Sequence, residues 1–355
     1  MPNVSRFQGW LGHSPDAADG RMEWDSFQPK EWTEDDVDIQ VTHCGICGSD
    51  IHNLRSSYGG LSDPCCVGHE IVGRAVQIGH NVTHVQLGDR VGVGAQAYSC
   101  LKCDDCLRDR EQYCQYELVP TYGFEYPGNK GRSYGGYANF NRTHGRFVFK
   151  IPDGLPSQLA APMLCAGITM FSPLLKYECG PGKRVGIVGV GGLGHFGLIF
   201  ARALGADTVV VLSPSSSRRN DFLAMGADLH IATEEEDQWQ VEHAGTLDLI
   251  VCSLSSEKAH LNAYLSLLGS CGTFIQVGFS DTGSLPPIAP NILIRKGIRV
   301  GGSMIGSPRE IRQMLDFASK ENVTPWVETW PMNEANQAII EMQNGKARYR
   351  YVLVQ

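Results

Sequence analysis

The sequence lacks any run of basic residues, and its 38 acidic side chains outnumber its 30 Lys and Arg side chains, for a formal net charge of −8. Nucleic acids and anionic membranes attract basic surfaces, so we expect neither as a partner. The first ten residues also lack an apolar core of signal-peptide length and a basic, acid-free amphipathic stretch. We therefore expect a cytoplasmic protein, in which the twelve cysteines are metal ligands or buried thiols instead of disulfides.

Residues 185–206 resemble the run of about 20 apolar residues that a transmembrane helix needs. The segment contains seven glycines, together with His195 and Arg202. Because these residues do not suit a membrane span, we expect no membrane association.

The same segment predicts a strand, a tight turn and a helix. An apolar stretch at 185–188 is followed by Gly189, Gly191, Gly192 and Gly194, and then by apolar residues at near-helical spacing. Glycines permit a sharp turn and a close approach of the backbone to a pyrophosphate, and the helix N-terminus offers free N–H groups to phosphates. The pattern therefore predicts a dinucleotide-binding turn.

After this turn, short strands alternate with helix-compatible segments. The strands are predicted at 185–190, 208–212, 229–232, 247–252, 272–278 and 298–302, with helices that include 218–225 and 258–268. Six strands complete a doubly wound sheet. At 355 residues the chain has room for two domains, and we predict an α/β fold with a parallel, doubly wound Rossmann domain over residues 166–303.

The first part of the chain predicts a small, irregular and mostly β domain over residues 1–165. Residues 37–41 alternate apolar and polar side chains as a half-buried strand does, and short strands continue to residue 93. After the Rossmann domain, Ser307, Pro308 and Glu310 form a helix start with a capping box. A second helix at 335–342 and a strand at 348–354 follow. Because six strands already complete the nucleotide sheet, we assign residues 304–355 to the first domain.

Four cysteines lie within fifteen residues in a lobe at about 97–116. They are Cys100, Cys103, Cys106 and Cys114. Four thiolates can enclose one Zn²⁺ and leave no position open, which is the pattern of a structural site. The alternatives are free surface thiols or a zinc ribbon that binds nucleic acid. The acidic residues of the lobe repel phosphates, which argues against the nucleic-acid-binding alternative.

Several motifs occur in one order along nearly the entire chain. They are Cys47, the triplet Gly68-His69-Glu70, the four-cysteine lobe, Cys165 and the glycine turn. In this order the sequence resembles the zinc-dependent medium-chain dehydrogenase/reductases, and within them the cinnamyl alcohol dehydrogenase-like, NADP-dependent alcohol dehydrogenases. The resemblance implies a GroES-like catalytic domain, a small alcohol or aldehyde substrate, and a homodimer.

The resemblance also implies a catalytic zinc held by Cys47, His69 and Cys165, with Glu70 as an alternative fourth ligand. Three protein ligands and one exchangeable position are typical of catalytic zinc. Asp50 is the candidate acceptor that orients His69. With the cysteine lobe, we expect two zinc ions per chain.

Zinc would act as a Lewis acid on the aldehyde or alcohol oxygen while the nicotinamide exchanges a hydride. By the resemblance, Ser49 and His52 relay the proton through the cofactor ribose, and an imidazole suits this role because it titrates near neutrality. The resemblance places Asn53, Tyr58, Tyr98, Tyr122, Phe279 and Ile292 around the substrate. Such aromatic and apolar walls favour aromatic or terpenoid aldehydes.

The end of the second Rossmann strand predicts the cofactor. An NAD enzyme usually has an Asp or Glu about 20 residues after the glycines, to bind the ribose 2′-hydroxyl. Here Ser213 stands at that point, and no carboxylate follows before Asp221. Hydroxyl and guanidinium groups suit a 2′-phosphate, so we predict NADP(H) bound by Ser213, Ser215 and Arg218. By similarity, Thr169 lies beside the cofactor, Gly192 and Leu193 at the pyrophosphate, and Val277 and Ser303 near the carboxamide.

Three other hypotheses remain. The chain could be an NAD-dependent polyol dehydrogenase, in which Arg218 and Arg219 only solvate the start of a helix. It could be a catalytically silent homologue that binds the cofactor. It could also be a regulatory zinc-ribbon protein. The leading hypothesis is a zinc-dependent, NADP-linked alcohol dehydrogenase that acts as an aldehyde reductase.

Overall fold

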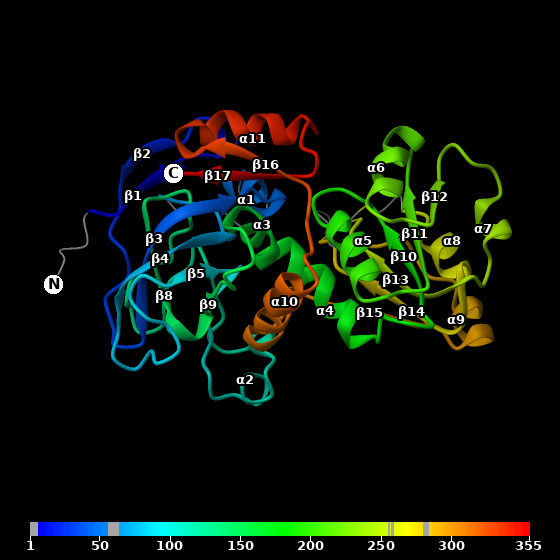
Figure 1. Ribbon diagram of the computed structural model, residues 1–355, viewed down its shortest axis with the longest axis horizontal. Helices are drawn as coiled ribbons and strands as arrows, with labels where there is room; N and C mark the ends of the chain where they lie inside the picture. Colours follow the sequence, from blue (N-terminus) through cyan, green and yellow to red (C-terminus); the bar gives the residue numbers. More distant parts are fainter. Residues whose placement is uncertain (1–5, 56–63, 255, 257–258, 280–283) are drawn as a thin grey trace. The chain divides into compact units, whose positions relative to one another are not determined.

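The structure is a computed structural model that describes residues 6–55, 64–254, 256, 259–279 and 284–355. It divides into two compact units. Unit 1 comprises residues 1–168, 306–322 and 326–355, and unit 2 comprises residues 169–305 and 323–325. Figure 1 shows both units, with the termini in unit 1.

Unit 1 is built on a seven-stranded sheet in the order β16-β17-β3-β4-β5-β9, with β8 also paired to β3. Its strands are β3 (Asp36–Gly45), β4 (Ile71–Ile78), β5 (Arg90–Val93), β8 (Phe140–His144), β9 (Val148–Lys150), β16 (Val327–Pro331) and β17 (Arg350–Val354). Two small sheets join β1 (Gln8–Leu11) to β2 (Glu23–Ser26) and β6 (Gln96–Tyr98) to β7 (Val119–Pro120). The irregular, mostly β domain expected from the sequence is therefore confirmed.

The described part of unit 1 also contains the helices α1 (Gly48–Leu54), α2 (Asp104–Leu107), α3 (Ser157–Pro162), α10 (Pro308–Lys320) and α11 (Ala335–Gln343), of which α3, α10 and α11 contact the large sheet. The capping box predicted for α10 is present. Ser307 Oγ accepts a hydrogen bond from the Glu310 N–H at 3.2 Å, and the Ser307 N–H donates to Glu310 Oε2 at 2.8 Å. β17 pairs with β3, so the last strand belongs to the sheet of unit 1.

Unit 2 is a six-stranded, wholly parallel sheet in the order β12-β11-β10-β13-β14-β15. The strands are β10 (Arg184–Val188), β11 (Thr208–Ser213), β12 (Leu229–Ala232), β13 (Leu247–Cys252), β14 (Leu268–Gln276) and β15 (Arg299–Gly302). This order corresponds to 3-2-1-4-5-6, the arrangement of a doubly wound dinucleotide fold. The predicted Rossmann sheet is confirmed.

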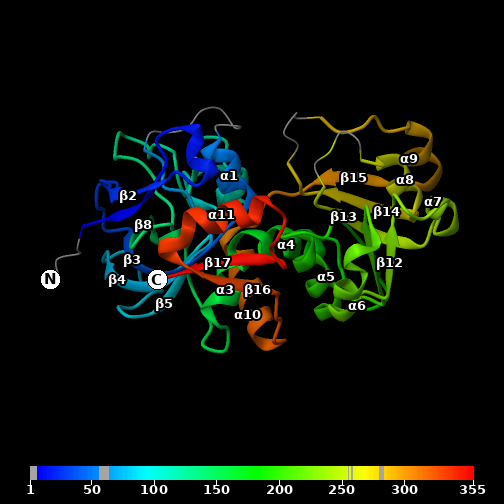
Figure 2. The ribbon, with the colours of Figure 1, turned by 90° about the horizontal axis from the view of Figure 1, so that it is seen from above.

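Helices cover both faces of this sheet. Figure 2 shows α5 (Gly194–Ala203) and α6 (Arg219–Ala224) on one face, and α8 (Leu261–Ser266) and α9 (Pro290–Lys296) on the other. The short α7 (Trp239–Glu242) contacts α8. A core of buried side chains, including Leu212, Ile250 and Phe274, lies between β-sheet and helices.

Several strands depart from their predicted limits, and the departure of β14 has an identifiable cause. β14 begins at Leu268 instead of residue 272, because Leu268 pairs with Leu247 before the register between β13 and β14 shifts. Cys271 then adopts a positive φ of 61°, which the sequence pattern gave no reason to expect at a non-glycine residue.

Residues 185–206 form β10, the glycine turn and α5, and therefore no single long helix. A different segment, Ser157–Lys176, is long and apolar enough to cross a membrane by length and composition, and 83% of its apolar window is buried inside the protein. It comprises α3, the π-helical turn Met163–Gly167 and α4 (Ile168–Lys176). Burial of this extent is typical of a core helix.

Candidate active site

Four potential metal ligands come together in unit 1. The ligand atoms of Cys47, His69, Glu70 and Cys165 all lie within 4.8 Å of one another, and all four side chains are buried. Cys47 precedes α1, His69 and Glu70 precede β4, and Cys165 lies in the π-helical turn. The wide turn at Met163–Gly167 is the local irregularity that often marks functional sites in helices.

Asp50 fixes the orientation of His69. Asp50 Oδ1 lies 2.9 Å from His69 Nδ1, while His69 Nε2 lies 3.1 Å from Cys165 Sγ. The Asp50 carboxylate also accepts hydrogen bonds from the Cys47 N–H, the Gly68 N–H and the Tyr137 hydroxyl, at 2.9, 3.2 and 3.2 Å. A carboxylate held by this many donors leaves Nε2 as the imidazole nitrogen that faces the cluster.

The two thiols of the cluster influence each other. A hydrogen bond from Cys165, with a further contribution from His69, holds the pKa of Cys47 well below its usual range. The same hydrogen bond and burial raise the pKa of Cys165. One thiolate therefore forms readily, and a divalent cation would favour the second because metal ligation deprotonates thiols.

Glu70 is the fourth member of the cluster. Its Oε1 forms an ion pair with Arg350 of β17, whereas Oε2 is buried and has no hydrogen-bond partner among the described residues. Burial raises the pKa of Glu70 to about 7, although Arg350 opposes this shift. Two sulfurs, one imidazole nitrogen and an unsatisfied carboxylate oxygen are a donor set that suits Zn²⁺.

The second cysteine cluster also lies in unit 1. The ligand atoms of Cys100, Cys103, Cys106 and Cys114 lie within 4.8 Å of one another. Sγ–Sγ distances of 3.9 Å join Cys100 to Cys106 and Cys103 to Cys114. A tetrahedron with Zn–S bonds of about 2.3 Å has S–S edges of about 3.8 Å, so these four thiols fit one zinc ion.

Helix α1 carries both residues predicted for the proton relay and one residue predicted for the substrate pocket. Ser49 and His52 are three residues apart on α1, directly after Cys47. On the same helix, Asn53 Nδ2 donates to the Ser49 carbonyl at 2.9 Å and to the Tyr122 hydroxyl at 3.4 Å. The Tyr122 ring lies 5.6 Å from the His69 ring. Tyr122 therefore lies beside a residue of the ligand cluster, and Asn53 contacts Tyr122.

Other predicted pocket residues lie elsewhere or outside the described part of the chain. Tyr98 packs against Tyr126 and His144 in a separate small cluster. In unit 2, Ile292 packs on the hydrophobic core and Phe279 is exposed. Tyr58 lies outside the described residues.

The glycine turn lines a cleft of about 490 Å³ in unit 2. Its walls are Gly189, Val190, Gly191, Gly192, Leu193, Ser213, Pro214, Ser215, Ser217, Arg218, Phe222, Ser253 and Leu254. A Cβ on Gly194 would lie 1.9 Å from the Gly189 carbonyl oxygen, so the turn requires glycine there. A Cβ on Gly191 would meet nothing within 4 Å, and the open space above it is where a phosphate can approach the backbone.

Besides Gly194, three predicted cofactor residues are not among the walls of this cleft. Thr169 is buried in α4, Val277 directly follows β14, and Ser303 directly follows β15. The Ser303 N–H donates to the Gln276 carbonyl at 3.1 Å. Val277 and Ser303 therefore lie at the carboxyl edge of the parallel sheet, where doubly wound folds bind ligands.

Comparison with known proteins identifies the family. Residues 33–153 match the alcohol dehydrogenase GroES-like domain, and residues 192–320 match the zinc-binding dehydrogenase domain. The chain is 42% identical to NADP-dependent alcohol dehydrogenase 6 of Saccharomyces cerevisiae over 332 residues, which cover 92% of this chain and 91% of the yeast protein. The chain belongs to the zinc-binding alcohol dehydrogenases. The predicted family is thereby confirmed, and the protein is an alcohol oxidoreductase.

Further relatives agree with this assignment. Cinnamyl alcohol dehydrogenase 3 of Arabidopsis thaliana is 37% identical and covers 99% of this chain and 92% of its own length. The solved structure of a cinnamyl alcohol dehydrogenase from Sorghum bicolor, SbCAD4, superposes with a TM-score of 0.91 at 35% identity, covering 99% of this chain and 98% of that one. The dehydrogenase therefore has the fold of the cinnamyl alcohol dehydrogenase-like branch.

Sequence reasoning missed several residues of the dehydrogenase that contact the predicted site. Arg350 was assigned only to an alternating strand, although all of β17 but its last residue is buried. Tyr137 and His230 were not singled out either. A charged residue within an otherwise apolar terminal strand was the available signal for Arg350.

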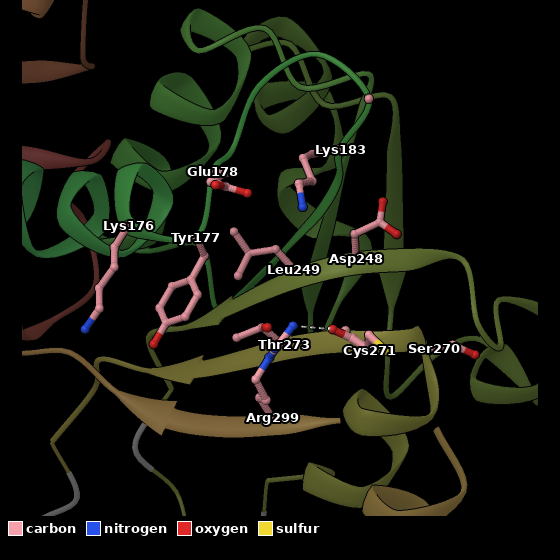
Figure 3. Close-up of a pocket in the computed structure, with 12 residues that line it drawn as sticks. Lys176, Tyr177, Glu178, Lys183, Asp248, Leu249, Ser270, Cys271, Thr273 and Arg299 are labelled. Atoms are coloured by element: carbon pink, nitrogen blue, oxygen red, sulfur yellow. Dashed lines mark hydrogen bonds between the residues drawn. The ribbon is translucent and has the colours of Figure 1, made fainter. Parts of the chain in front are cut away.

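A second cavity of unit 2, of about 530 Å³, lies at the amino ends of β13, β14 and β15. Figure 3 shows Lys183, Asp248 and Arg299 around it, with Arg299 bonded to the Cys271 carbonyl. Asp248 is itself paired with Arg184 at 2.8 Å. Since doubly wound folds bind ligands at the carboxyl ends of their strands, this cavity is not the dinucleotide site.

Proposed function

We propose that this dehydrogenase is a zinc-dependent, NADP(H)-linked alcohol dehydrogenase that acts as an aldehyde reductase on aromatic or other apolar primary alcohols and aldehydes. One observation carries the proposal above all. Cys47, His69 and Cys165 converge beside a buried carboxylate oxygen that lacks a hydrogen-bond partner among the described residues. Such a set holds a cation with three ligands and leaves one position exchangeable.

Zinc, when bound by these residues, supplies a Lewis acid for the substrate oxygen, and NADP(H) supplies or takes the hydride. The chain orients this chemistry. Asp50 holds His69 with Nε2 toward the cluster. Arg350 pairs with Oε1 of Glu70 and leaves Oε2 without a hydrogen-bond partner among the described residues.

The proton of the reaction is assigned to Ser49 and His52. Both lie on α1, directly after Cys47 and one helical turn apart. Residues three positions apart share one side of a helix. The Ser49 hydroxyl can therefore pass a proton outward, and the His52 imidazole can exchange it with water.

The loop after β11 supports NADP(H) over NAD(H). Ser213, Ser215, Ser217 and Arg218 line the cleft beside the glycine turn, and none of the cleft's wall residues is acidic. Hydroxyl and guanidinium donors suit a phosphate dianion. The yeast relative is named as NADP-dependent, and a Helicobacter pylori cinnamyl alcohol dehydrogenase, 30% identical and with a TM-score of 0.89, was solved in complex with NADP(H).

An aldehyde panel assayed with NADPH and with NADH tests the proposal directly. We expect kcat/KM for a cinnamaldehyde-type substrate to be highest with NADPH, and metal analysis to find two zinc ions per chain. A preference for NADH and polyols would instead establish the NAD-dependent polyol dehydrogenase, and a zinc content of one would favour a silent homologue.

We also propose that the protein is a homodimer, as the family resemblance implies, and that it is cytoplasmic. The edge strand β15 supports pairing between two copies, because Arg299 and Val300 are exposed at the border of the sheet. Light scattering on the purified protein decides the oligomeric state, and an elution mass of one chain would reject the dimer.

A further inference from the structure

A chain of hydrogen bonds lies behind the loop assigned to the 2′-phosphate. Arg219 Nε lies 3.3 Å from His230 Nδ1, His230 Nε2 lies 2.8 Å from Ser213 Oγ, and Ser213 Oγ lies 3.0 Å from the Ser215 carbonyl oxygen. His230 is a buried residue of β12 at the centre of these contacts. It is not among the residues that line the dinucleotide cleft.

The chemistry of arginine determines the direction of every bond in this chain. A guanidinium can only donate, so His230 Nδ1 must accept and the imidazole proton is on Nε2. Nε2 therefore donates to Ser213 Oγ. The single hydroxyl proton of Ser213 is then directed to the Ser215 carbonyl, and each donor in the chain has an acceptor.

This direction gives Ser213 a different part from the one expected of a phosphate ligand. Its only proton is committed to the backbone of the loop, so Ser213 cannot donate to a phosphate while the chain of bonds is intact. The donors that line the cleft besides Ser213 belong to Arg218 and to the hydroxyls of Ser215 and Ser217. These two hydroxyls lie 2.9 Å apart and share one hydrogen bond, so one of their two protons is left for a ligand. Ser213 and His230 instead hold the backbone from which these three side chains project.

The surroundings of His230 hold it in place. The Phe222 ring of α6 packs edge-on against the imidazole, with 5.0 Å between ring centroids. Arg219 is anchored in turn by Glu236, whose carboxylate lies 2.5 Å from Nη2 and also accepts the Ala232 N–H at 3.2 Å. The position of the imidazole is therefore set by two elements besides its own strand.

We propose that His230 is a positioning residue for NADP(H) recognition, which acts through the Ser213 hydroxyl on the loop that contacts the 2′-phosphate. This inference rests on the proposed function, because it takes the 2′-phosphate as the group that the loop binds. It assigns part of the preference for NADP(H) to a side chain that touches no cofactor.

Two substitutions separate positioning from simple packing. His230→Leu removes both hydrogen-bonding roles. His230→Gln is the matched control, because its amide can donate to Ser213 and accept from Arg219 at the spacing of the two ring nitrogens. We expect His230→Leu to raise the NADPH Kd about tenfold, the effect of losing one or two hydrogen bonds, with the NADH Kd changed less than about twofold. His230→Gln should restore most of the NADPH affinity.

A double-mutant cycle tests whether Ser213 carries the effect. Ser213→Ala should weaken NADPH binding about as much as His230→Leu, and the double variant should be no weaker than either. Hydrogen exchange of the peptide that covers residues 213–219, measured without cofactor, should quicken in His230→Leu and stay slow in His230→Gln.

The outcomes distinguish this inference from the proposed function. A wild-type enzyme that does not prefer NADPH overturns the proposed function and this inference with it. If the wild type prefers NADPH but His230→Leu weakens NADPH and NADH equally, or leaves both unchanged, only the inference fails. Melting temperatures of both variants show whether a loss comes from unfolding: a His230→Leu protein that is unfolded while His230→Gln binds NADPH like the wild type supports the hydrogen-bonding role.

Discussion

Gly45 shows how closely the metal cluster depends on single atoms. A Cβ at this position would lie 1.9 Å from Glu70 Oε2, so Gly45→Ala must displace the carboxylate that pairs with Arg350. We expect the free energy of unfolding to fall by about 1–3 kcal/mol, as for other overpacked sites, and the zinc content to drop toward one per chain. Chemical denaturation and metal analysis measure both.

Gly48→Ala is the matched control for this substitution. It lies three residues away, near the other end of the Cys47 segment, and an added Cβ there meets nothing within 4 Å. It should keep stability and both zinc ions. Equal behaviour of the two variants would mean that Glu70 has room to move and does not need its present place.

The protonation of His230 predicts how NADPH affinity depends on pH. Burial, and then the charge of Arg219, lower the pKa of His230, whereas Glu236 and Glu235 oppose the shift. The neutral imidazole is therefore the folded form near pH 7. Protonation as the pH falls through this lowered pKa puts a proton on Nδ1, where Arg219 donates, so NADPH affinity should fall in that range. Stability contributed by the neutral form should be lost in the same direction, since the unfolded histidine takes up a proton first.

The cofactor phosphate also titrates near pH 6, so the measurement needs a variant without the imidazole. His230→Gln keeps the phosphate titration and the hydrogen bonds but has no ionisable group at this position. The ratio of the NADPH Kd values of wild type and His230→Gln, measured between pH 7.5 and pH 5 (about the range of histidine titration), should rise as the pH falls. A constant ratio would show that His230 does not titrate there.

The proposed second zinc ion would hold the four-cysteine lobe together. Between Cys100 and Cys114 its regular parts are the single turns α2 and Glu111–Tyr113, and Leu101 and Asp109 have positive φ values of 57° and 55°. Such a segment buries little apolar surface, so Cys103→Ser should release one zinc and lower the melting temperature before turnover at low temperature is lost. Cys271→Ser, at an exposed cysteine, is the control and should change neither.

The elements that the sequence predicted well are those with a local signal. The six strands and the glycine turn of unit 2 follow from apolar periods and turn residues, and the capping box of α10 from three residues. The early start of β14 was missed because it depends on the pairing of Leu268 with Leu247 in the neighbouring strand β13, which no local sequence pattern indicates. The Glu70–Arg350 pair joins residues 280 positions apart, and no local pattern connects them.

His230 was missed for a different reason. A single histidine within a short apolar strand has the same local pattern whether it only packs or also directs a hydrogen-bond chain. Its partners Arg219 and Ser213 come from α6 and β11, so only the tertiary structure brings them together. The metal ligands Cys47, His69 and Cys165 were proposed from their order along the chain, and the structure brings their side chains to one place.

By the proposed function, the two units hold different parts of the chemistry. All residues proposed as zinc ligands lie between positions 1 and 168, in unit 1, whereas the glycine turn and the serine loop lie in unit 2. Removal of zinc by a chelator should therefore abolish turnover and quicken hydrogen exchange around residues 97–116 and in the segments of Cys47, His69 and Cys165. Because the sheet of unit 2 has its own buried core, its amides should stay protected and NADPH should still bind through the loop after β11.

Arg218→Ala in the zinc-free protein gives the control, since it should weaken NADPH binding about tenfold, the size of one charge-assisted contact. Loss of protection in β10 to β15 on chelation would contradict this division, because it would mean that unit 2 needs the metal-bound unit 1 to stay folded.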